Sequence, residues 1–216
     1  MDNVDAACQS DIVVIAVRPS DLASTLAPLR PHWRSDQIVV SVVAALTLPW
    51  LRSHLGPLPA LCRWMPAPSL ASVRAPLPAS REPGSDATRL EPAARLGRSL
   101  ARELIWTSDD QLDLLMVTVG AVTTHLSALL GELLLWGEAH GLDPAALDRM
   151  LTSAVAASGE QFAADGSVAT ALRHATTPGG MTDASMLALQ SSGALKALSQ
   201  GAEAMLERVR ALRGAL

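Results

Sequence analysis

The segment Thr177-Pro-Gly-Gly-Met-Thr182 combines residue types that bind anions when they precede a helix. Two consecutive glycines favour a tight turn, and a turn that runs into a helix start leaves backbone N–H groups without intrahelical partners. Such N–H groups can hold a carboxylate or a phosphate. Thr182 adds a hydroxyl beside these donors, although a threonine at this place is also typical of a helix N-cap. The segment therefore predicts an anion-binding turn, and the two roles of Thr182 are compatible.

Arg18 is a second candidate, because it follows directly after the apolar run Asp11–Val17 and precedes Pro19. Ligands of an open parallel sheet bind at the carboxyl ends of its strands, where an arginine can meet a phosphate. The plainer interpretation is a solvated surface arginine. The chain has no GxGxxG or Walker motif, so the sequence supplies no glycine-rich phosphate cradle.

The other residues with reactive side chains form no catalytic or metal-binding pattern. Cys8 and Cys62 are too few and too far from any histidine cluster to predict a zinc site. His125 lies in an apolar stretch, and we expect a core histidine bonded to a neighbour. His140 and His174 are expected at the surface. No Ser-His-Asp spacing is present, and no metal site is predicted.

The elements that must position these residues divide the chain into two parts. β-branched and apolar runs predict five strands, of which the fourth is weakened by prolines: 11–17, 37–43, 61–64, 75–78 and 104–106. Helical segments are expected between them at 20–29, 47–55 and 91–102, and turn residues dominate 80–86. Strands that alternate with helices predict an α/β region with parallel strands, from residue 1 to 107.

Residues 108–216 carry no strand pattern and predict an all-α domain. Beyond the long apolar stretch described next, helices are expected from Pro144 to about Ala157, at 167–174 and at 187–212, with an interruption near Ser191–Gly193. Asp143 followed by Pro144 is typical of a helix start.

The stretch 113–138 is apolar nearly all round at helical spacing, and 114–131 carries no formal charge. A helix of about 28 residues spans roughly 40 Å and must be buried. A bilayer is one environment that buries such a helix, but the cluster of polar residues at mid-span (Thr118, Thr123, Thr124, His125, Ser127) and the acidic flanks argue against it. We therefore predict no membrane span, and burial against other helices of this chain or of a second copy.

Composition limits the function classes. The 216 residues are 49% hydrophobic, which is enough for a sizeable core, and the net charge of −4 gives no basic footprint for nucleic acid. Two cysteines do not make a secreted disulfide framework, and the first residues lack the basic start and apolar core of a signal peptide. A cytoplasmic protein is expected.

Five motifs in order resemble the pyrroline-5-carboxylate reductases: DIVVIAVRP, VVSVVAALT, RWMPAPS, a long apolar helix and TPGGMT. The resemblance covers essentially the whole chain. It implies a Rossmann-type domain at 1–107 and a helical dimerisation domain at 108–216 whose long helices interleave with those of a partner. It also implies a homodimer or higher homo-oligomer and NADP or NAD as the cofactor. The reduced form, NAD(P)H, would transfer a hydride to the imine carbon of pyrroline-5-carboxylate, a small cyclic imine, which gives proline.

The resemblance assigns site residues position by position. Those implied to border the nucleotide are Ala16, Val17, Arg18, Pro19, Ala44, Ala45, Pro66 and Ala67. Those implied to bind substrate are Gly120, Thr177, Pro178, Gly179, Gly180 and Met181. Thr182 is the implied catalytic residue, its hydroxyl approaching the imine. No metal is implied.

The chain departs from the family pattern at several of these positions. Leu46 is aligned with the usual glycine of the second loop, and Ala67, between Pro66 and Pro68, with the usual asparagine. Val119–Thr123 replaces Ser-Gly-Ser-Gly-Pro, so that Val122 adds a branched side chain where the family has glycine.

The resemblance also begins inside the Rossmann-type domain, so that its first strands and their glycine-rich turn are missing from the expected partial parallel sheet. An apolar sheet edge should then be exposed, and a chain that starts at Met1 is expected to bind NADP or NAD weakly or not at all. Two hypotheses remain open: an NAD(P)H-dependent imine reductase, and a catalytically silent dimerisation or scaffold protein derived from that family.

Overall fold

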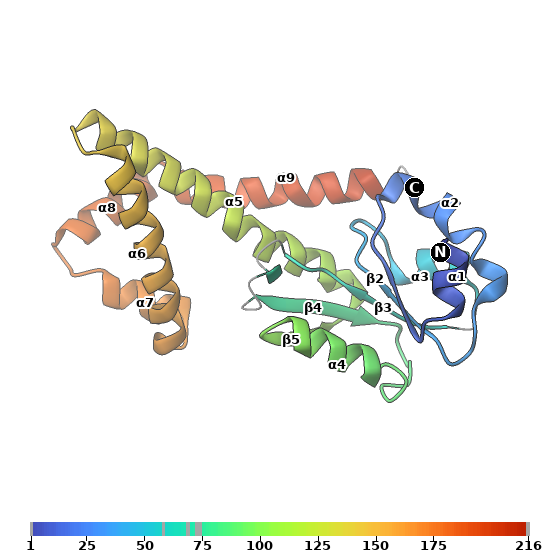
Figure 1. Ribbon diagram of the computed structural model, residues 1–216. Helices are drawn as coiled ribbons and strands as arrows, with labels where there is room; N and C mark the ends of the chain where they lie inside the picture. The colour runs from blue at the N-terminus through green and yellow to red at the C-terminus, as the bar shows by residue number, and fades with distance from the viewer. Residues whose placement is uncertain (1, 58, 68–69, 72–74, 215–216) are drawn as a thin grey trace. The chain divides into compact units, whose positions relative to one another are not determined.

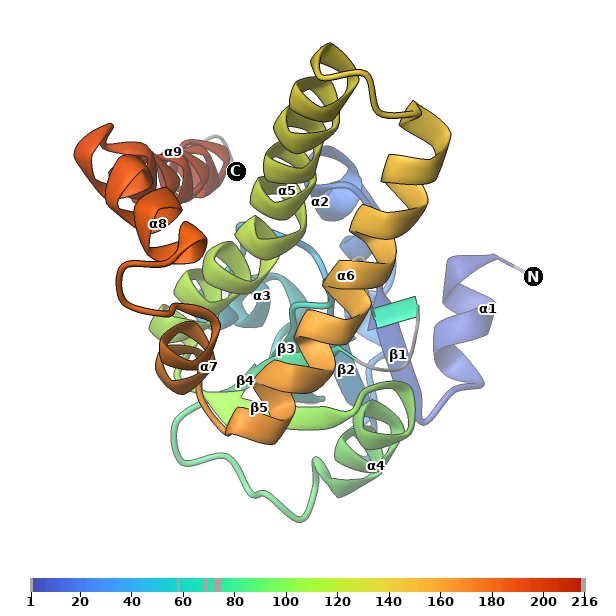
Figure 2. The same cartoon turned by 90° about the vertical axis from the view of Figure 1, so that its left-hand side faces the viewer.

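The computed structural model describes residues 2–57, 59–67, 70–71 and 75–214, and it contains two compact units. One unit comprises the chain up to Gly120 together with the residues from Ala202 onward, and the other comprises Ala121–Gly201. We call them the sheet unit and the helical unit. Figure 1 labels the helices α1–α9 and the strands β2–β5, and Figure 2 also labels β1.

The sheet unit is built on five strands in the order β1-β2-β3-β4-β5. Their bounds are Ile12–Ile15 (β1), Ile38–Ser41 (β2), Ala60–Trp64 (β3), Pro76–Arg81 (β4) and Glu103–Thr107 (β5). β1, β2 and β3 are mutually parallel, β4 is antiparallel to β3, and β5 is parallel to β4. The predicted α/β sheet is therefore confirmed as mostly parallel.

One strand pair, β3 and β4, departs from the expected parallel arrangement, and the short connection between these strands gives the reason. Parallel neighbours need a crossover of roughly a dozen residues or more, usually with a helix, and only residues 65–75 connect β3 to β4. The predicted turn at 80–86 also began too early, because Ser80 and Arg81 still pair with Arg63 and Cys62.

Helices cover both faces of this sheet (Figures 1 and 2). The short helices and turns of the sheet unit are Asn3–Cys8 (α1), Pro19–Asp21 (η1), Leu22–Leu26 (α2), Arg30–His32 (η2), Leu48–Leu55 (α3) and Glu91–Leu100 (α4). Leucines of α2 and α3 pack with Val39 in one core cluster, and residues of α4 pack with Ile38 and Val40 in another. The strand β2 is thus buried on both faces, which explains its unbroken β-branched run.

Local signals explain the ends of α3. Thr47 accepts a hydrogen bond from the N–H of Trp50 at 3.2 Å, and Gly56 ends the helix with φ 80°. The six-residue helix α1 was not predicted from the sequence; Asp2 caps it by accepting the N–H of Asp5.

Five helices make up the rest of the described chain: Asp109–Ala139 (α5), Pro144–Asp165 (α6), Val168–Ala175 (α7), Met181–Ser191 (α8) and Ala194–Gly214 (α9). α5 and α9 each run from one unit into the other. The predicted break at 191–193 is confirmed, with Gly193 at φ 77°. The predicted end of α6 near Ala157 was wrong, since the helix continues to Asp165 and stops at Gly166 in a left-handed conformation.

α5 is the one helix of the described residues that is long and apolar enough to cross a membrane by length and composition, and core helices of soluble proteins pass the same test. Many of its apolar side chains are exposed in the single chain, among them Val122, Leu129, Leu133 and Leu135. The predicted burial of this helix is therefore not achieved within one protomer.

Candidate functional site

Three loops leave the sheet at one edge. Ile15 of β1 pairs with Ser41 of β2, which pairs with Arg63 of β3, so the carboxyl ends of these parallel strands lie together. The residues assigned to the nucleotide by resemblance belong to the loops that follow: Ala16, Val17, Arg18 and Pro19 after β1, Ala44 and Ala45 after β2, and Pro66 and Ala67 after β3. Pro68 lies outside the described residues. Strand ends of this kind are the usual ligand-binding edge of an open α/β sheet.

Arg18 is the positively charged residue of the first loop, three positions after the end of β1. Its side chain is 84% exposed, and its Nε donates to a carboxylate oxygen of Asp21 at 2.9 Å. The pair is solvated, so its contribution to stability is small. Most of the guanidinium surface therefore stays available to a phosphate.

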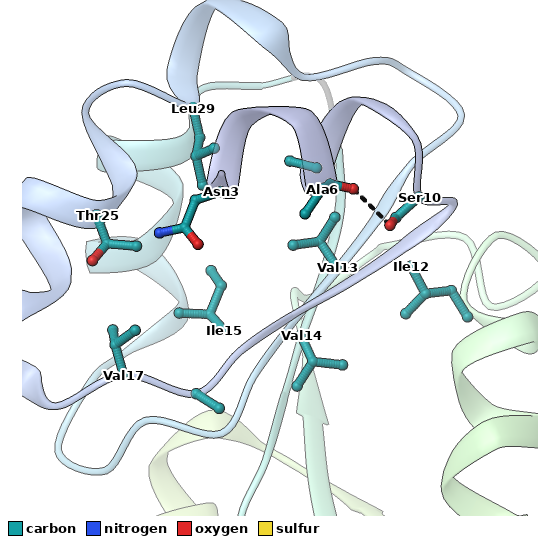
Figure 3. A pocket seen from close by; sticks show the side chains of 12 residues that line it. Asn3, Ala6, Ser10, Ile12, Val13, Val14, Ile15, Val17, Thr25 and Leu29 are labelled. Atoms are coloured by element: carbon teal, nitrogen blue, oxygen red, sulfur yellow. Dashed lines mark hydrogen bonds between the residues drawn. The ribbon is translucent and has the colours of Figure 1, made fainter. Parts of the chain in front are cut away.

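A pocket of about 250 Å³ lies beside the first loop (Figure 3). Its walls come mainly from α1 and β1, with Ala16 and Val17 at the end of the strand. Asn3, Ser10 and Thr25 are its polar lining residues, and the Ser10 hydroxyl is already donated to the carbonyl of Ala6 at 2.7 Å. This lining suits an uncharged, largely apolar group and offers no charged side chain to a phosphate.

Ala45 in the second loop has φ 64°, the only positive φ of a non-glycine residue in the described chain. The left-handed region costs a residue with a Cβ roughly 1–2 kcal/mol. The fully buried Ala45 packs with Val117 of α5 and Val209 of α9. Glycine tolerates a positive φ best, so this backbone conformation would suit the family's glycine at Ala45 rather than at Leu46. The alignment of these positions with the family stays a prediction.

A buried ionic network lies against this loop, and sequence reasoning missed it. Arg63, with no exposed surface, donates to Asp109 at 2.5 Å and to Asp113 at 3.2 Å. Asp113 is also bound by Arg213 of α9. Asp109 accepts the Ser80 hydroxyl at 2.9 Å and the N–H of Leu48, the first residue of α3, at 2.8 Å. The sequence held two signals of this network: an arginine inside an apolar strand, and two aspartates four residues apart at a helix start.

The turn before α8 uses its glycine donors internally. Gly179, at φ 72°, donates its N–H to the Asp183 carboxylate at 2.9 Å, and Gly180 donates to the Thr177 carbonyl at 2.9 Å. The expectation of unpaired N–H groups at these two glycines was therefore wrong. The Asp183 contact has the geometry of a helix cap in which a side chain of the first turn reaches back to the preceding backbone.

Thr182 is not the helix cap that the sequence suggested. Gly180 is the N-cap and Thr182 lies inside the first turn, where its hydroxyl oxygen accepts the N–H of Thr177 at 3.4 Å. The neighbouring Pro178 and Met181 are exposed, Met181 by 92%. The turn belongs to the helical unit and the three loops belong to the sheet unit, so their meeting at one substrate stays a prediction.

Gly120, the remaining substrate candidate, lies in α5 at the boundary of the sheet unit. A Cβ added to it would lie 3.7 Å from the Met205 side chain of α9, an ordinary packing distance. The glycine is therefore not required for close packing here, and its role toward a substrate stays a prediction.

The histidines are placed partly as expected. His140, stacked on Trp136, and His174, bonded to Asp165 at 2.9 Å, are exposed. A hydrogen bond from Gln161, and then the one from His174, hold the pKa of Asp165 below its usual range. His125 is half-buried against Gly201, and among the described residues its ring has no hydrogen bond, so the expected bonded core histidine was wrong. The described residues contain no group of three or more side chains suited to a metal ion.

Two family models match the chain in separate regions. Residues 109–212 match the model of the pyrroline-5-carboxylate reductase dimerisation domain, and residues 1–45 match the model described as NADP oxidoreductase, coenzyme F420-dependent. The first region contains all of α5–α8 and most of α9, and the second contains the loop after β1 and the first part of the loop after β2.

Curated proteins with similar sequences carry the same family name. The chain is 27% identical to the pyrroline-5-carboxylate reductase of Pseudomonas aeruginosa, over 96% of this chain and 79% of that protein. It is 25% identical to pyrroline-5-carboxylate reductase 2 of Bacillus subtilis, over 85% of this chain and 66% of that protein.

Solved structures share the fold. The pyrroline carboxylate reductase of Plasmodium falciparum, solved with NADP bound, matches with a TM-score of 0.86 at 18% identity, over 99% of this chain and 81% of that chain. The pyrroline-5-carboxylate reductase of Coxiella burnetii also gives 0.86, at 21% identity, over 98% and 79%.

Proposed function

We propose that this chain, which belongs to the pyrroline-5-carboxylate reductase family, acts as an NAD(P)H-dependent imine reductase. The proposed substrate is pyrroline-5-carboxylate or a related cyclic imine, and the product of the former is proline. The observation that carries the proposal is the shared edge where β1, β2 and β3 end, because the three loops of the implied nucleotide site emerge there. We propose a cytoplasmic location for this reaction.

The loops at that edge fit a dinucleotide in their residue types. Ala16, Ala44 and Ala67 have small side chains, which allow a ligand to approach the backbone closely, and Arg18 supplies an exposed charge for a phosphate. The apolar pocket beside Val17 suits an uncharged ring. When bound, a reduced nicotinamide supplies a hydride.

Thr182 has the hydrogen-bonding state that the proposed reaction needs. Reduction of a C=N bond adds a hydride to carbon, and the nitrogen must either already carry a proton, as an iminium, or take one up from solvent. A hydroxyl that donates a hydrogen bond to this nitrogen polarises the C=N bond toward the hydride. Because the Thr182 oxygen accepts the Thr177 N–H, the hydrogen of its own hydroxyl is free to be donated to the substrate nitrogen. The helix start at α8 favours an anionic group such as a substrate carboxylate near the same turn.

A homodimer is part of the proposal, since the helical unit leaves its apolar surface uncovered. A groove of about 580 Å³ lies along α5 and α9 in this unit; we call it the α5 groove, and its apolar lining includes Leu129, Leu135 and Leu198. A second copy that presents the same kind of helices would cover it, as the name of the matching dimerisation model suggests.

The test is a calorimetric titration of NADPH and, separately, NADH against the purified 216-residue chain, followed by absorbance assays with pyrroline-5-carboxylate. The reductase proposal expects saturable binding and substrate-dependent consumption of the nucleotide. Thr182→Val should lower kcat about 100-fold with little change in NADPH affinity. Thr152→Val, which removes an exposed hydroxyl from α6, is the matched control.

A catalytically silent dimerisation protein is the second candidate. The observation that favours it is the internal pairing of the Gly179 and Gly180 N–H groups, which occupies two proposed substrate donors. This candidate predicts a stable dimer that binds neither NADPH nor NADH, whereas saturable nucleotide binding contradicts it.

A further inference from the structure

The loop after β2 depends on a conformation that alanine does not favour by itself. Ala45 has φ 64° and is fully buried, and residues of this kind keep a left-handed backbone only where their surroundings hold it. The methyl group packs in the cluster that contains Val117 and Val209. Packing alone does not fix the direction of the peptide group, so the hydrogen bonds of the Ala45 backbone become important.

Arg213 holds the Ala45 carbonyl. Its Nε donates to that oxygen at 3.2 Å, and its other nitrogen binds the Asp113 carboxylate. Asp113 is buried and also accepts from Arg63 at 3.2 Å. The guanidinium is therefore oriented from one side by a buried ion pair, and the nitrogen facing Ala45 is fixed in direction.

The same network fixes the exit of the loop. Asp109, which is bound to Arg63, accepts the N–H of Leu48 at 2.8 Å, where the loop becomes α3. Two arginines and two aspartates thus connect to the loop at Ala45 and at Leu48, and their formal charges cancel. A neutral, interlinked group of this kind serves to fix geometry rather than to add stability.

We infer that Arg213 is a positioning residue for the proposed nucleotide site: it keeps Ala45 in the left-handed conformation and so sets the backbone path of the loop Val42–Leu46. The inference rests on the proposed function. Without the Arg213 bond, Ala45 relaxes toward a negative φ, the peptide groups of the loop turn, and the fraction of molecules able to bind nucleotide falls. Nucleotide affinity falls by the same factor.

A double-mutant cycle on the full chain tests this mechanism, with calorimetric NADPH dissociation constants and thermal midpoints for the wild type, Arg213→Ala, Ala45→Gly and the double variant. Arg213→Ala should weaken NADPH about tenfold, which equals about 1.4 kcal/mol. Glycine populates positive and negative φ about equally, so in the Ala45→Gly background the same change should cost about twofold or less. Arg210→Ala, which removes an exposed arginine from the same helix, should leave the affinity unchanged.

The outcomes separate this inference from the proposed function. If the wild type binds no nucleotide, the reductase proposal fails and this inference fails with it. If the wild type binds and Arg213→Ala costs the same factor in both backgrounds, or nothing in either, only the inference is overturned. A purely structural arginine would lower the thermal midpoint equally in both backgrounds without a difference in affinity loss. If Arg213→Ala does not fold, Arg213→Lys replaces it. Lysine keeps the ion pair with Asp113 but lacks the second nitrogen that donates to the Ala45 carbonyl. The loss of NADPH affinity should again be smaller in the Ala45→Gly background.

Discussion

The two units of the chain satisfy their apolar residues in different ways. The sheet unit buries many of its leucines, valines and isoleucines in clusters on both faces of the sheet. Among the described residues of the helical unit, the only buried apolar side chains are those of Ala121 and Ala171. Fourteen of the eighteen exposed large hydrophobic side chains among the described residues lie between Val122 and Leu198. The helical unit therefore has helices but no core of its own.

The exposed apolar side chains of the helical unit indicate where its missing packing contacts are to be sought. Exposed apolar surface on this scale marks an interaction surface. The sheet unit needs no partner for its two clusters, except along β1, the outer strand of the described sheet, where Val14 is 46% exposed. The helical unit leaves most of its apolar surface uncovered, and a second copy with the same helices is the partner proposed for it.

The largest expected effect comes from a charge in the α5 groove. Leu129 of α5 and Leu100 of α4 are similarly exposed, at 49% and 44%. If a second copy covers the groove, Leu129→Asp buries an unpaired carboxylate at roughly 3 kcal/mol, twice in each dimer. The dimer dissociation constant should rise at least about 1,000-fold. Analytical ultracentrifugation measures it.

Leu100→Asp is the matched control, because it places the same charge at a similarly exposed helical leucine of the sheet unit. It should leave the dimer intact. A Leu129→Asp protein that still sediments as the wild-type dimer contradicts the assignment of the partner surface to this groove.

The second effect concerns the sheet unit alone. Arg63→Met removes the buried cation and leaves Asp109 without its charge partner, while Asp113 keeps only Arg213. Leaving a buried charge unpaired costs about 3–5 kcal/mol, so the free energy of unfolding should fall by that amount in urea denaturation. Arg98→Met breaks an exposed pair with Glu91 in α4 and should cost less than about 1 kcal/mol. Equal losses in the two variants would mean that the loss of Arg63 leaves no buried charge unpaired.

The sequence predicted what depends on local pattern. The run Ile38–Ser41 predicted a strand buried on both faces, and Thr47 and Gly56 marked the two ends of α3, because these signals act within a few residues. The network around Arg63 was not predicted, since Asp109 and Asp113 lie 46 and 50 residues away along the chain and only the tertiary fold brings them together. The positive φ at Ala45 also escaped prediction, because alanine carries no signal for it.

The turn Thr177–Thr182 was likewise predicted only in part. The glycine pair predicted a turn before a helix. It did not predict that the Gly179 N–H is already bonded, because a single aspartate four residues later carries no sequence signal for that contact. The domain boundary at 107/108 and the roles of the site residues stay predictions.

The third effect is a change in substrate preference at this turn. Asp183 holds a negative charge and the Gly179 donor where a substrate carboxylate is proposed to bind. Asp183→Asn removes that charge, so the KM for pyrroline-5-carboxylate should fall about tenfold. The KM for 1-pyrroline, which has no carboxylate, should change little. Steady-state kinetics with both imines measures the ratio, and an equal change for both would show that Asp183 does not act on the carboxylate.

The fourth effect uses the buried thiol of the sheet core. Burial raises the pKa of Cys62 to about 12. In the unfolded chain the thiol ionises at about pH 8.5–9. Between about pH 9 and 12 the folded state therefore binds more protons than the unfolded state. The free energy of unfolding falls as pH rises through this range. Between pH 8 and pH 10 the loss should reach about 1.4–1.9 kcal/mol.

The chain has no tyrosine, and Lys196 is its single lysine, so few other side chains titrate in this range. Urea denaturation of the wild type and of Cys62→Ala from pH 8 to 10 isolates the contribution, because the variant should lose the pH dependence. Cys8→Ala, which removes the exposed thiol, should keep it. A wild type as stable at pH 10 as at pH 8 would mean that the β3 core admits water to the thiol. The contrast between a sealed sheet core and an open helical unit would then be weaker than the buried side chains indicate.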